Sequence, residues 1–331
     1  MQTIEFKNRP KIIGNYAIAG PKEGKGPFGQ YFDYVMQKDS FGEKTYELAE
    51  RKMFEQAVTG ALQSAGLKSA DINLMLAGDL LNQIISSSFT ARAFNMPYLG
   101  LFGACSTMAE SLATGATLID GGYFNNVVCV TGSHFSTAER QFRFPLELGN
   151  QRVPTSQWTV TAAGASVLSM EGEGPQVCMA TYGRVIDYGV VDVNNMGAAM
   201  APSAADTIIT HLADTGRKPS YYDLIVTGDL GKLGAEILID LLEEKGIRLG
   251  LNYSDCGHCY YTREQDTMCG ASGCGVSASI LNSYIIRKMK KGEYKKVLLV
   301  ATGALMSTTA SQQGESIPGV SHAVVLEMGG E

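Results

Sequence analysis

The heptapeptide LMLAGDL at residues 74–80 recurs in the second half of the chain as LIVTGDL at residues 224–230. Each copy is an apolar run that ends in glycine and aspartate, a pattern typical of a strand buried on both faces. Three further echoes follow in the same order: GAC at 103–105 with GAS at 270–272, VTG at 130–132 with ATG at 301–303, and the apolar positions of 165–170 with those of 323–328. Four echoes in one order indicate two related halves, residues 1–172 and 173–331.

The segments around these echoes alternate between strand and helix patterns. Apolar runs predict strands at 11–17, 72–77, 127–131 and 160–170. Apolar residues three and four apart predict helices at 43–65, between Cys105 and Gly121, and at 279–291. Residues 171–175, EGEGP, form a linker pattern between the halves. This alternation predicts an α/β fold in which each half contains a largely parallel sheet with right-handed crossovers.

The composition is that of an ordinary globular protein with a net negative charge. The 331 residues are 45% hydrophobic and 18% charged, and the formal net charge is -6. An acidic chain lacks the basic surface that neutralises phosphates, so nucleic acid is not an expected partner. Seven cysteines scattered through a chain of this length indicate reduced thiols, not a disulfide framework. The N-terminus does not have a signal-peptide layout, and no apolar run is long enough to span a bilayer.

The GAC segment places Cys105 between small residues at the predicted start of a helix. A thiol becomes a nucleophile only where a neighbouring base or a positive potential generates the thiolate. The free N–H groups and the dipole of the helix start favour the thiolate, whereas Glu110 in the first turn opposes it. Thr107 and Glu110 have the spacing of a capping box, which would occupy this glutamate. Cys105 is therefore a candidate nucleophile, with a plain buried cysteine as the alternative.

Two tandem α/β halves, with a cysteine at a helix start and a GASG loop at 270–273, resemble the thiolase superfamily. The resemblance implies a five-layered αβαβα fold, in which two pseudo-symmetric α/β halves enclose a pocket with Cys105 at its base. Within the superfamily, the chain is similar to the soluble component of the SpoVA sporulation proteins of spore-forming bacteria. The segments that carry this similarity are LAGDLLNQ (76–83), FGACST (102–107), TAERQFR (137–143), MAP (200–202), AADT (204–207), TGDL (227–230) and IP (317–318).

The partners that thiolase-type chemistry needs are missing at the matching positions. Where the condensing enzymes have HQAN, this chain has GDLG at 228–231, and where thiolases have GHP, it has DTM at 266–268. Where thiolases have a second cysteine, it has ATG at 301–303. The resemblance thus implies a thiolase-like protein that lacks the catalytic histidines and is not an enzyme. Of the histidines present, His134, His211, His258 and His322, the best candidates to activate Cys105 are His258 and His322.

The sporulation resemblance also implies a ligand, pyridine-2,6-dicarboxylic acid (dipicolinic acid), alone or chelated to calcium. It implies a binding site around Cys105 and Asp255. The other predicted ligand-binding residues are Gly103, Ser106, Gly270, Ser272 and Arg140. A helix N-terminus beside Cys105 suits an anionic carboxylate, whereas Asp255 would repel a bare dianion and is expected to face calcium, the ring nitrogen or its own loop. No cofactor and no metal site of the protein are predicted.

The resemblance further implies uptake of dipicolinate into the developing spore and its release in germination. It places the protein in the forespore cytosol when it is made, and then at the inner spore membrane. The expected partners are integral-membrane SpoVA subunits, through which it would be peripheral to the membrane, and a homodimer is a further option. Two other classes stay open: an acyltransferase or condensing enzyme using Cys105 alone, and a structural subunit that only docks on a membrane complex.

A cysteine-rich segment has two weaker interpretations. CGHC at 256–259 is the pattern of thiol oxidoreductases, but the YYTR that follows suggests a strand or hairpin where the motif needs a helix. A zinc site would use Cys256, Cys259, Cys269 and Cys274. Neither interpretation is favoured.

Arginines and glycines supply the remaining candidates. The guanidinium groups that could bind a carboxylate are those of Arg140, Arg143, Arg152 and Arg184. The glycine-rich segment 19–27 lacks the P-loop order of glycine, lysine and hydroxyl residue. It is therefore predicted to be a surface loop.

Overall fold

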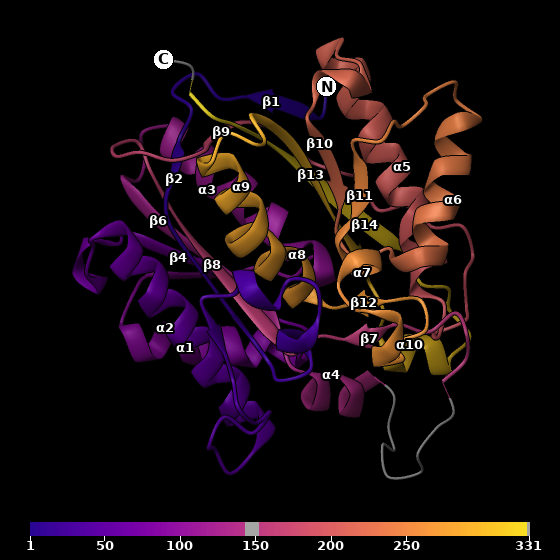
Figure 1. Cartoon of the computed structure of the whole chain (residues 1–331), viewed down its shortest axis with the longest axis horizontal. Helices are drawn as coiled ribbons and strands as arrows, with labels where there is room; N and C mark the ends of the chain where they lie inside the picture. The colour runs from indigo at the N-terminus through magenta and orange to yellow at the C-terminus, as the bar shows by residue number, and fades with distance from the viewer. Residues whose placement is uncertain (143–151, 330–331) are drawn as a thin grey trace.

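The computed structural model describes residues 1–142 and 152–329. Two half-sheets lie on either side of a central layer of helices, and other helices cover their outer faces (Figure 1). The outer helices are α1 (Tyr46–Ala65) and α2 (Ile85–Phe94) on one side and α5 (Met196–Thr215) and α6 (Gly231–Glu243) on the other. The central helices are α3 (Thr107–Asp120), α8 (Cys274–Ile280) and α9 (Ile286–Lys290). The predicted five-layered αβαβα fold is confirmed.

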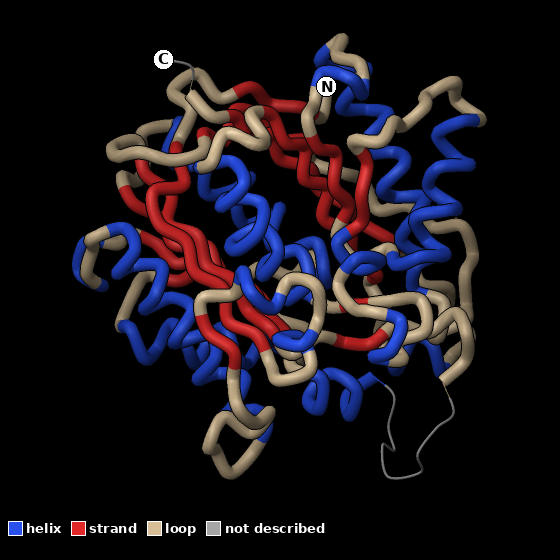
Figure 2. Tube along the Cα trace, viewed as in Figure 1, coloured by secondary structure: helices blue, strands red, loops and turns tan. Residues whose placement is uncertain are grey.

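The two halves order and orient their strands in the same way. Figure 2 shows the two groups of strands on either side of the central helices. The first half has the order β5 (Tyr98–Gly100), β4 (Leu74–Gly78), β6 (Asn126–Ser133), β8 (Ala162–Ser169) and β2 (Lys11–Ala19). The second has β11 (Tyr253–Asp255), β10 (Leu224–Thr227), β13 (Lys296–Ala304), β14 (Gly319–Glu327) and β9 (Gln176–Thr181). In each half the first three strands are parallel and the last two pairings are antiparallel.

The prediction of a largely parallel sheet is wrong for those last two pairings. The connection from β13 to β14 contains only the short helix α10 (Thr308–Gln312), and that from β6 to β8 contains α4 (Phe135–Phe142). The chain returns antiparallel in β14 and β8, so parallel pairing is confined to the first three strands of each half.

Several strand pairings join the two halves. β2 and β9 meet where Lys11 pairs with Gln176. β1 (Thr3–Glu5) pairs with β9, so the N-terminal strand lies on the sheet of the second half. β7 (Trp158–Thr159) of the first half pairs with β12 (Ala271–Ser272) of the second. β3 (Tyr34–Val35) pairs with β2 within the first half.

The central helices α3 and α8 are buried, and most of their own buried residues are small or apolar. The residues of α3 that are fully buried include Met108, Ala109, Leu112, Ala113 and Ala116. A helix that is apolar on all sides packs between two layers. α3 packs on β6 of its own half and on β14 of the other, and α8 packs on β8 and β6 of the first half. Their N-terminal ends carry Cys105 and Cys274 to the junction of the halves.

Two predicted helices begin elsewhere. The helix predicted from residue 43 begins at Tyr46, because the Thr45 side chain caps it by accepting a hydrogen bond from the Leu48 N–H at 3.3 Å. The helix predicted at 279–291 begins at Cys274 and includes a π-helical turn, Leu281–Ile285, before α9. Gly273, with φ of +109°, turns the chain into it.

The glycine-rich segment 19–27 is not the predicted surface loop. Gly20 and Glu23 are buried, and a Cβ at Gly26 would lie 2.6 Å from the carbonyl oxygen of Tyr260. The glycines thus allow the backbone of the first half to approach the second half closely. Among residues 1–142 and 152–329, no helix combines the length and the apolar character that crossing a bilayer requires.

Candidate functional site

Cys105 lies where the two halves meet. A 3-10 turn, Ala104–Ser106, precedes α3, and Ala104 has φ of +49°, an unusual value for a residue with a side chain. Gly303, near the end of β13, packs against this turn. A Cβ there would lie 2.2 Å from the carbonyl oxygen of Gly103 and 3.3 Å from the backbone nitrogen of Cys105. The strained turn is therefore held by contacts from both halves.

A narrow pocket of about 60 Å³ adjoins the Cys105 thiol. Its lining is mainly apolar and is made by Leu80, Phe102, Ala104, Cys105, Ala138, Glu139, Phe142, Thr159, Val193, Met196, Met200, Ser272, Ala304 and Met306. A wider depression of about 360 Å³ shares Leu80, Phe102, Phe142 and Met306 with it and forms its outer part. Among the described residues that line the pocket, there is no lysine, arginine or histidine.

The surroundings of Cys105 favour the neutral thiol. The Cys274 thiol and the Asp229 carboxylate are its polar neighbours, and Cys274 Sγ itself donates to the Ala104 carbonyl at 3.0 Å. The contact with Cys274, burial and the charge of Asp229 raise the pKa of the Cys105 thiol well above its usual value. Because the thiolate is the nucleophilic form, a thiol held protonated is a poor nucleophile.

Asp229 occupies the segment where the condensing enzymes have HQAN, and it lies under the pocket. Its carboxylate accepts hydrogen bonds from Ser272 Oγ at 3.0 Å, Gly273 N at 2.9 Å and Thr302 Oγ1 at 2.8 Å. Burial raises the pKa of Asp229, and these donors and the Cys105 thiol lower it in part. From the sequence, Asp229 is not selected as a site residue, although GDLG at 228–231 marks its position, and Cys274 is considered only as a zinc ligand.

Asp255 is buried beside this cluster, and it does not line the pocket. One carboxylate oxygen accepts from Thr227 Oγ1 at 2.7 Å and Leu230 N at 3.1 Å. The other accepts from Gly231 N at 2.9 Å and His258 N at 2.8 Å. Burial raises the pKa of Asp255 to about 7, although these four donors favour the carboxylate. The side chain therefore holds the loops that follow β10 and β11, which is one of the roles expected for it.

The structure brings only some of the predicted ligand-binding residues together. Ser272 joins Cys105 in the pocket lining. Gly103 and Ser106 lie in the turn behind the thiol, where Ser106 Oγ donates to the Gly103 carbonyl at 2.7 Å. Gly270 instead lines a separate polar depression. Arg140 is half exposed, pairs with Glu47 and lies outside the pocket lining.

Comparison with known proteins agrees with this geometry. A family model described as stage V sporulation protein AD (SpoVAD) matches residues 1–327. The chain belongs to the stage V sporulation protein AD family. Stage V sporulation protein AD of Bacillus subtilis (strain 168) is 46% identical over 329 residues, which cover 99% of this chain and 97% of that protein. Family membership supports a role in sporulation.

Solved structures of thiolase-like enzymes share the fold of this SpoVAD-family chain. The 3-oxoacyl-[acyl-carrier-protein] synthase III of Aquifex aeolicus VF5 is 14% identical, with a TM-score of 0.58 and coverage of 96% of this chain and 99% of that one. Cerulenin-bound OleA of Xanthomonas campestris is 14% identical, with a TM-score of 0.62 and coverage of 98% and 100%. At this identity the likeness extends to the fold alone, and it agrees with the thiolase-like architecture.

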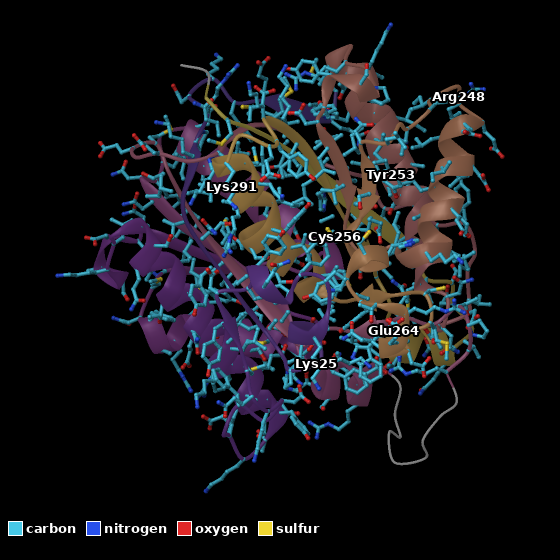
Figure 3. All side chains as sticks on the ribbon, in the orientation of Figure 1. Lys25, Arg248, Tyr253, Cys256, Glu264 and Lys291 are labelled. Carbon is cyan, nitrogen blue, oxygen red and sulfur yellow. The ribbon has the colours of Figure 1, made fainter. Side chains whose placement is uncertain are left out.

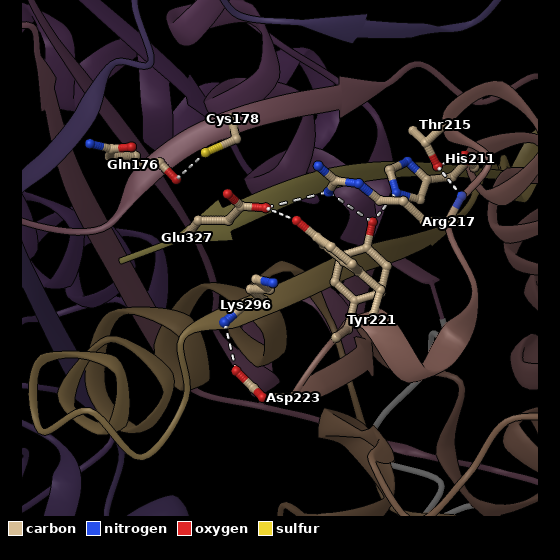
Figure 4. Close-up of polar contacts among 10 residues, drawn as sticks. Gln176, Cys178, His211, Thr215, Arg217, Tyr221, Asp223, Lys296 and Glu327 are labelled. Atoms are coloured by element: carbon tan, nitrogen blue, oxygen red, sulfur yellow. Dashed lines mark hydrogen bonds and ion pairs between the residues drawn. The ribbon is translucent and has the colours of Figure 1, made fainter. Parts of the chain in front are cut away.

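None of the four histidines of this SpoVAD-family chain lines the Cys105 pocket. His134 Nε2 contacts the Asp39 carbonyl at 2.9 Å, and His322 Nδ1 accepts from Gly183 N at 3.2 Å. His211 lies between the hydroxyls of Thr181 and Tyr222, near the Arg217–Glu327 ion pair (Figure 4). His258 is exposed at the polar depression that Gly270 also lines. The two proposed activators, His258 and His322, are thus outside the pocket.

The predicted capping box at the start of α3 does not form. Thr107 Oγ1 donates to the Ala104 carbonyl at 2.7 Å and accepts from Gly103 N at 3.1 Å, so it stabilises the preceding turn. Glu110 packs against Gly103, and burial raises its pKa to about 6. Glu110 therefore adds little negative charge at the helix start in slightly acidic solution.

The cysteine-rich segment folds differently from its prediction. CGHC forms a short helix, α7 (Cys256–Cys259), directly after β11. The strand or hairpin predicted for the YYTR that follows is wrong, because residues 260–262 are not in a strand and a 3-10 helix, Arg263–Gln265, comes next. Cys256 lies toward the interior (Figure 3), where burial raises the pKa of its thiol well above the usual value, whereas Cys259 is exposed. Within the described ranges, no cluster of three or more His, Cys, Asp and Glu side chains is arranged to hold a metal ion.

Arg152 and Arg184, two further candidate arginines, lie outside the lining of the Cys105 pocket. Arg152 packs over the Trp158 ring, 4.0 Å from its centroid. Arg184 is exposed and pairs with Asp206. Arg143 lies outside the described residues.

Proposed function

We propose that this SpoVAD-family protein binds dipicolinic acid in the Cys105 pocket and does not transfer acyl groups. The observation that carries the proposal is the environment of Cys105. Where acyl transfer would need a base, a second thiol and a buried carboxylate raise the pKa of the Cys105 thiol. A protonated thiol instead serves as a weak hydrogen-bond donor.

The pocket suits an aromatic ligand. Phe102, Phe142 and the three methionines Met196, Met200 and Met306 provide faces and sulfur atoms on which a flat ring packs. The outer depression widens the space, so a ligand larger than the inner pocket would extend into it. The backbone N–H groups at the start of α3 are suited to a carboxylate.

The charge of the pocket favours a neutral form of the ligand. Glu139 lines it, and Asp229 lies beneath Cys105 and Ser272. A dipicolinate dianion would meet these carboxyl groups without a cation among the described lining residues. The calcium chelate has no net charge, so we expect it to bind more tightly than the free dianion.

In the cell, this binding would serve uptake of dipicolinate into the developing spore and its release in germination. The protein would be made in the forespore cytosol and act at the inner spore membrane. There it would be a peripheral partner of integral-membrane SpoVA subunits, as a monomer or a homodimer. A pocket that binds without turnover is suited to handing a ligand to a membrane channel.

Titration calorimetry on the purified protein tests the binding. We expect saturable heat with dipicolinate, a lower Kd when calcium is added, and about tenfold weaker binding by Cys105→Ala because a donor and its packing are lost. Cys129→Ala is the matched control, because Cys129 is also buried but donates to Ser111 O at 3.3 Å outside the pocket. The absence of both heat and competition at millimolar ligand would overturn the proposal.

The acyltransferase alternative is tested on the same protein. Intact-mass analysis after incubation with acyl-CoA should find no adduct, because Cys105 is held as the thiol. A stable acyl group located on Cys105 would favour the enzyme. A protein that neither binds dipicolinate nor becomes acylated would be a structural subunit.

A further inference from the structure

Glu23 is a carboxyl group buried between the two halves. It lies on a 3-10 turn of the glycine-rich segment, and the residue is 1% exposed. Its Oε1 atom accepts hydrogen bonds from Tyr261 Oη at 2.5 Å and from Thr161 N at 3.2 Å. Its Oε2 atom is buried and has no hydrogen-bond partner among the described residues. An ionised carboxylate left half-satisfied in this way is costly, so the site favours the protonated acid.

A second carboxylate faces the same space. A Cβ at Gly20 would lie 2.5 Å from Glu23 Oε2 and 3.2 Å from Asp39 Oδ1, so the missing side chain at Gly20 lets both groups approach. Two like charges this close disfavour simultaneous ionisation. Because Asp39 is exposed and Glu23 is buried, the proton belongs on Glu23.

Contacts around Glu23 join the halves. Lys22 Nζ donates to the Gln265 carbonyl at 2.8 Å, and Gln265 Nε2 donates to the Lys22 carbonyl at 2.7 Å. The Lys22 ammonium also lies 3.8 Å from the centroid of the Trp158 ring. In Figure 3, Lys25 marks the glycine-rich segment and Glu264 marks the facing segment of the second half.

We propose that Glu23 is a proton-operated latch, which holds segment 20–26 of the first half against segment 260–265 of the second half and loosens when its proton is lost. One contact of Glu23, Thr161, lies two residues after Thr159, which lines the Cys105 pocket. Tyr261, the other contact, lines the separate polar depression. Loosening would therefore change the lining of that polar depression.

The charged and titratable groups around Glu23 determine whether the latch loosens as the pH rises or as it falls. Lys22 and Asp39 come from its own half, Tyr260 and Tyr261 from the facing segment, and Arg152 from the chain before β7, while His134 contacts the Asp39 carbonyl. Burial raises the pKa of Glu23 to about 7; the Tyr261 and Thr161 bonds oppose this, and Asp39 adds to it. Since the folded-state pKa lies above the unfolded one, the latch is intact on the acidic side and is lost as pH rises through about 7.

Trp158 reports on the latch, because it is the single tryptophan of the chain and contacts Lys22. In a pH titration of the full-length protein, we expect its emission to shift to longer wavelength with a midpoint near 7. Glu23→Gln should abolish the transition and keep the acidic-side spectrum throughout. Tyr261→Phe removes a donor that favours the carboxylate, so its midpoint should be higher.

Two controls separate Glu23 from its neighbours. Glu173→Gln changes an exposed glutamate and should leave the transition unchanged. Lys22→Met should alter the amplitude and keep the transition. The latch is refuted if wild-type emission is constant from pH 5.5 to 8.5, if Glu23→Gln retains the transition, or if Lys22→Met alone removes it.

Discussion

Replacing Asp255 with alanine is expected to lower the free energy of unfolding by about 3–5 kcal/mol. The substitution leaves four donors without their acceptor: Thr227 Oγ1 and the backbone N–H groups of Leu230, Gly231 and His258. Three of them are backbone groups that cannot rotate away, so the loops after β10 and β11 must rearrange. Urea unfolding followed by circular dichroism measures the change in midpoint.

Asp240→Ala is the control for this prediction, because Asp240 is exposed on α6 in the same half. A surface change of this kind should cost less than about 0.5 kcal/mol. If Asp255→Ala unfolds at the wild-type midpoint and yet loses dipicolinate binding, Asp255 is a ligand-contacting residue, as the sequence predicts. Reduced binding that follows reduced stability would instead mark it as a structural residue.

Asp229→Asn is expected to raise the rate of Cys105 alkylation by about tenfold or more at pH 7.5, because the pKa of the thiol falls and more thiolate is present. The substitution removes the negative charge beside the thiol and keeps the shape of the side chain. The amide oxygen can still accept from Gly273 N, and the Thr302 hydroxyl can donate or accept. The site should therefore remain folded.

Site-resolved mass spectrometry after iodoacetamide treatment measures this rate. In the wild-type protein, the exposed Cys259 should react first and Cys105 far more slowly. Cys129, buried in the core, is the internal control and should be equally slow in both proteins. Rapid alkylation of wild-type Cys105, or no acceleration in Asp229→Asn, would show that Asp229 does not hold the thiol protonated. In that case the acyltransferase alternative would gain support.

The different roles of Asp229 and Asp255 could not be predicted from the sequence. Both aspartates lie in short motifs, GDLG at 228–231 and DCGH at 255–258, and both are buried. No local pattern distinguishes a carboxylate that contacts the Cys105 thiol from one enclosed by four donors. Their difference depends on Ser272, Gly273 and Thr302, which meet Asp229 only when β12, α8 and β13 are packed together.

The packing of the glycine-rich segment 19–27 against the second half could not be predicted from the sequence either. Its glycines, without the P-loop order, predict a surface loop. In the structure, they allow close contact with Tyr260 and bury Glu23 against Tyr261, on segments distant in the chain. Such contacts between distant segments leave no periodic signal in the sequence.

By itself, the sequence determined the α/β class, the repeat and the position of Cys105 at a helix start. These features depend on local apolar periodicity and on a duplicated order of motifs, which are readable along the chain. Only the tertiary structure decided what surrounds the thiol. In the folded protein, Cys274 and Asp229 lie beside Cys105. Arg140, Gly270 and the four histidines lie outside the lining of the Cys105 pocket. The reason is physical: protonation and charge depend on distances and burial across two halves, and those are fixed only when the sheets and central helices pack.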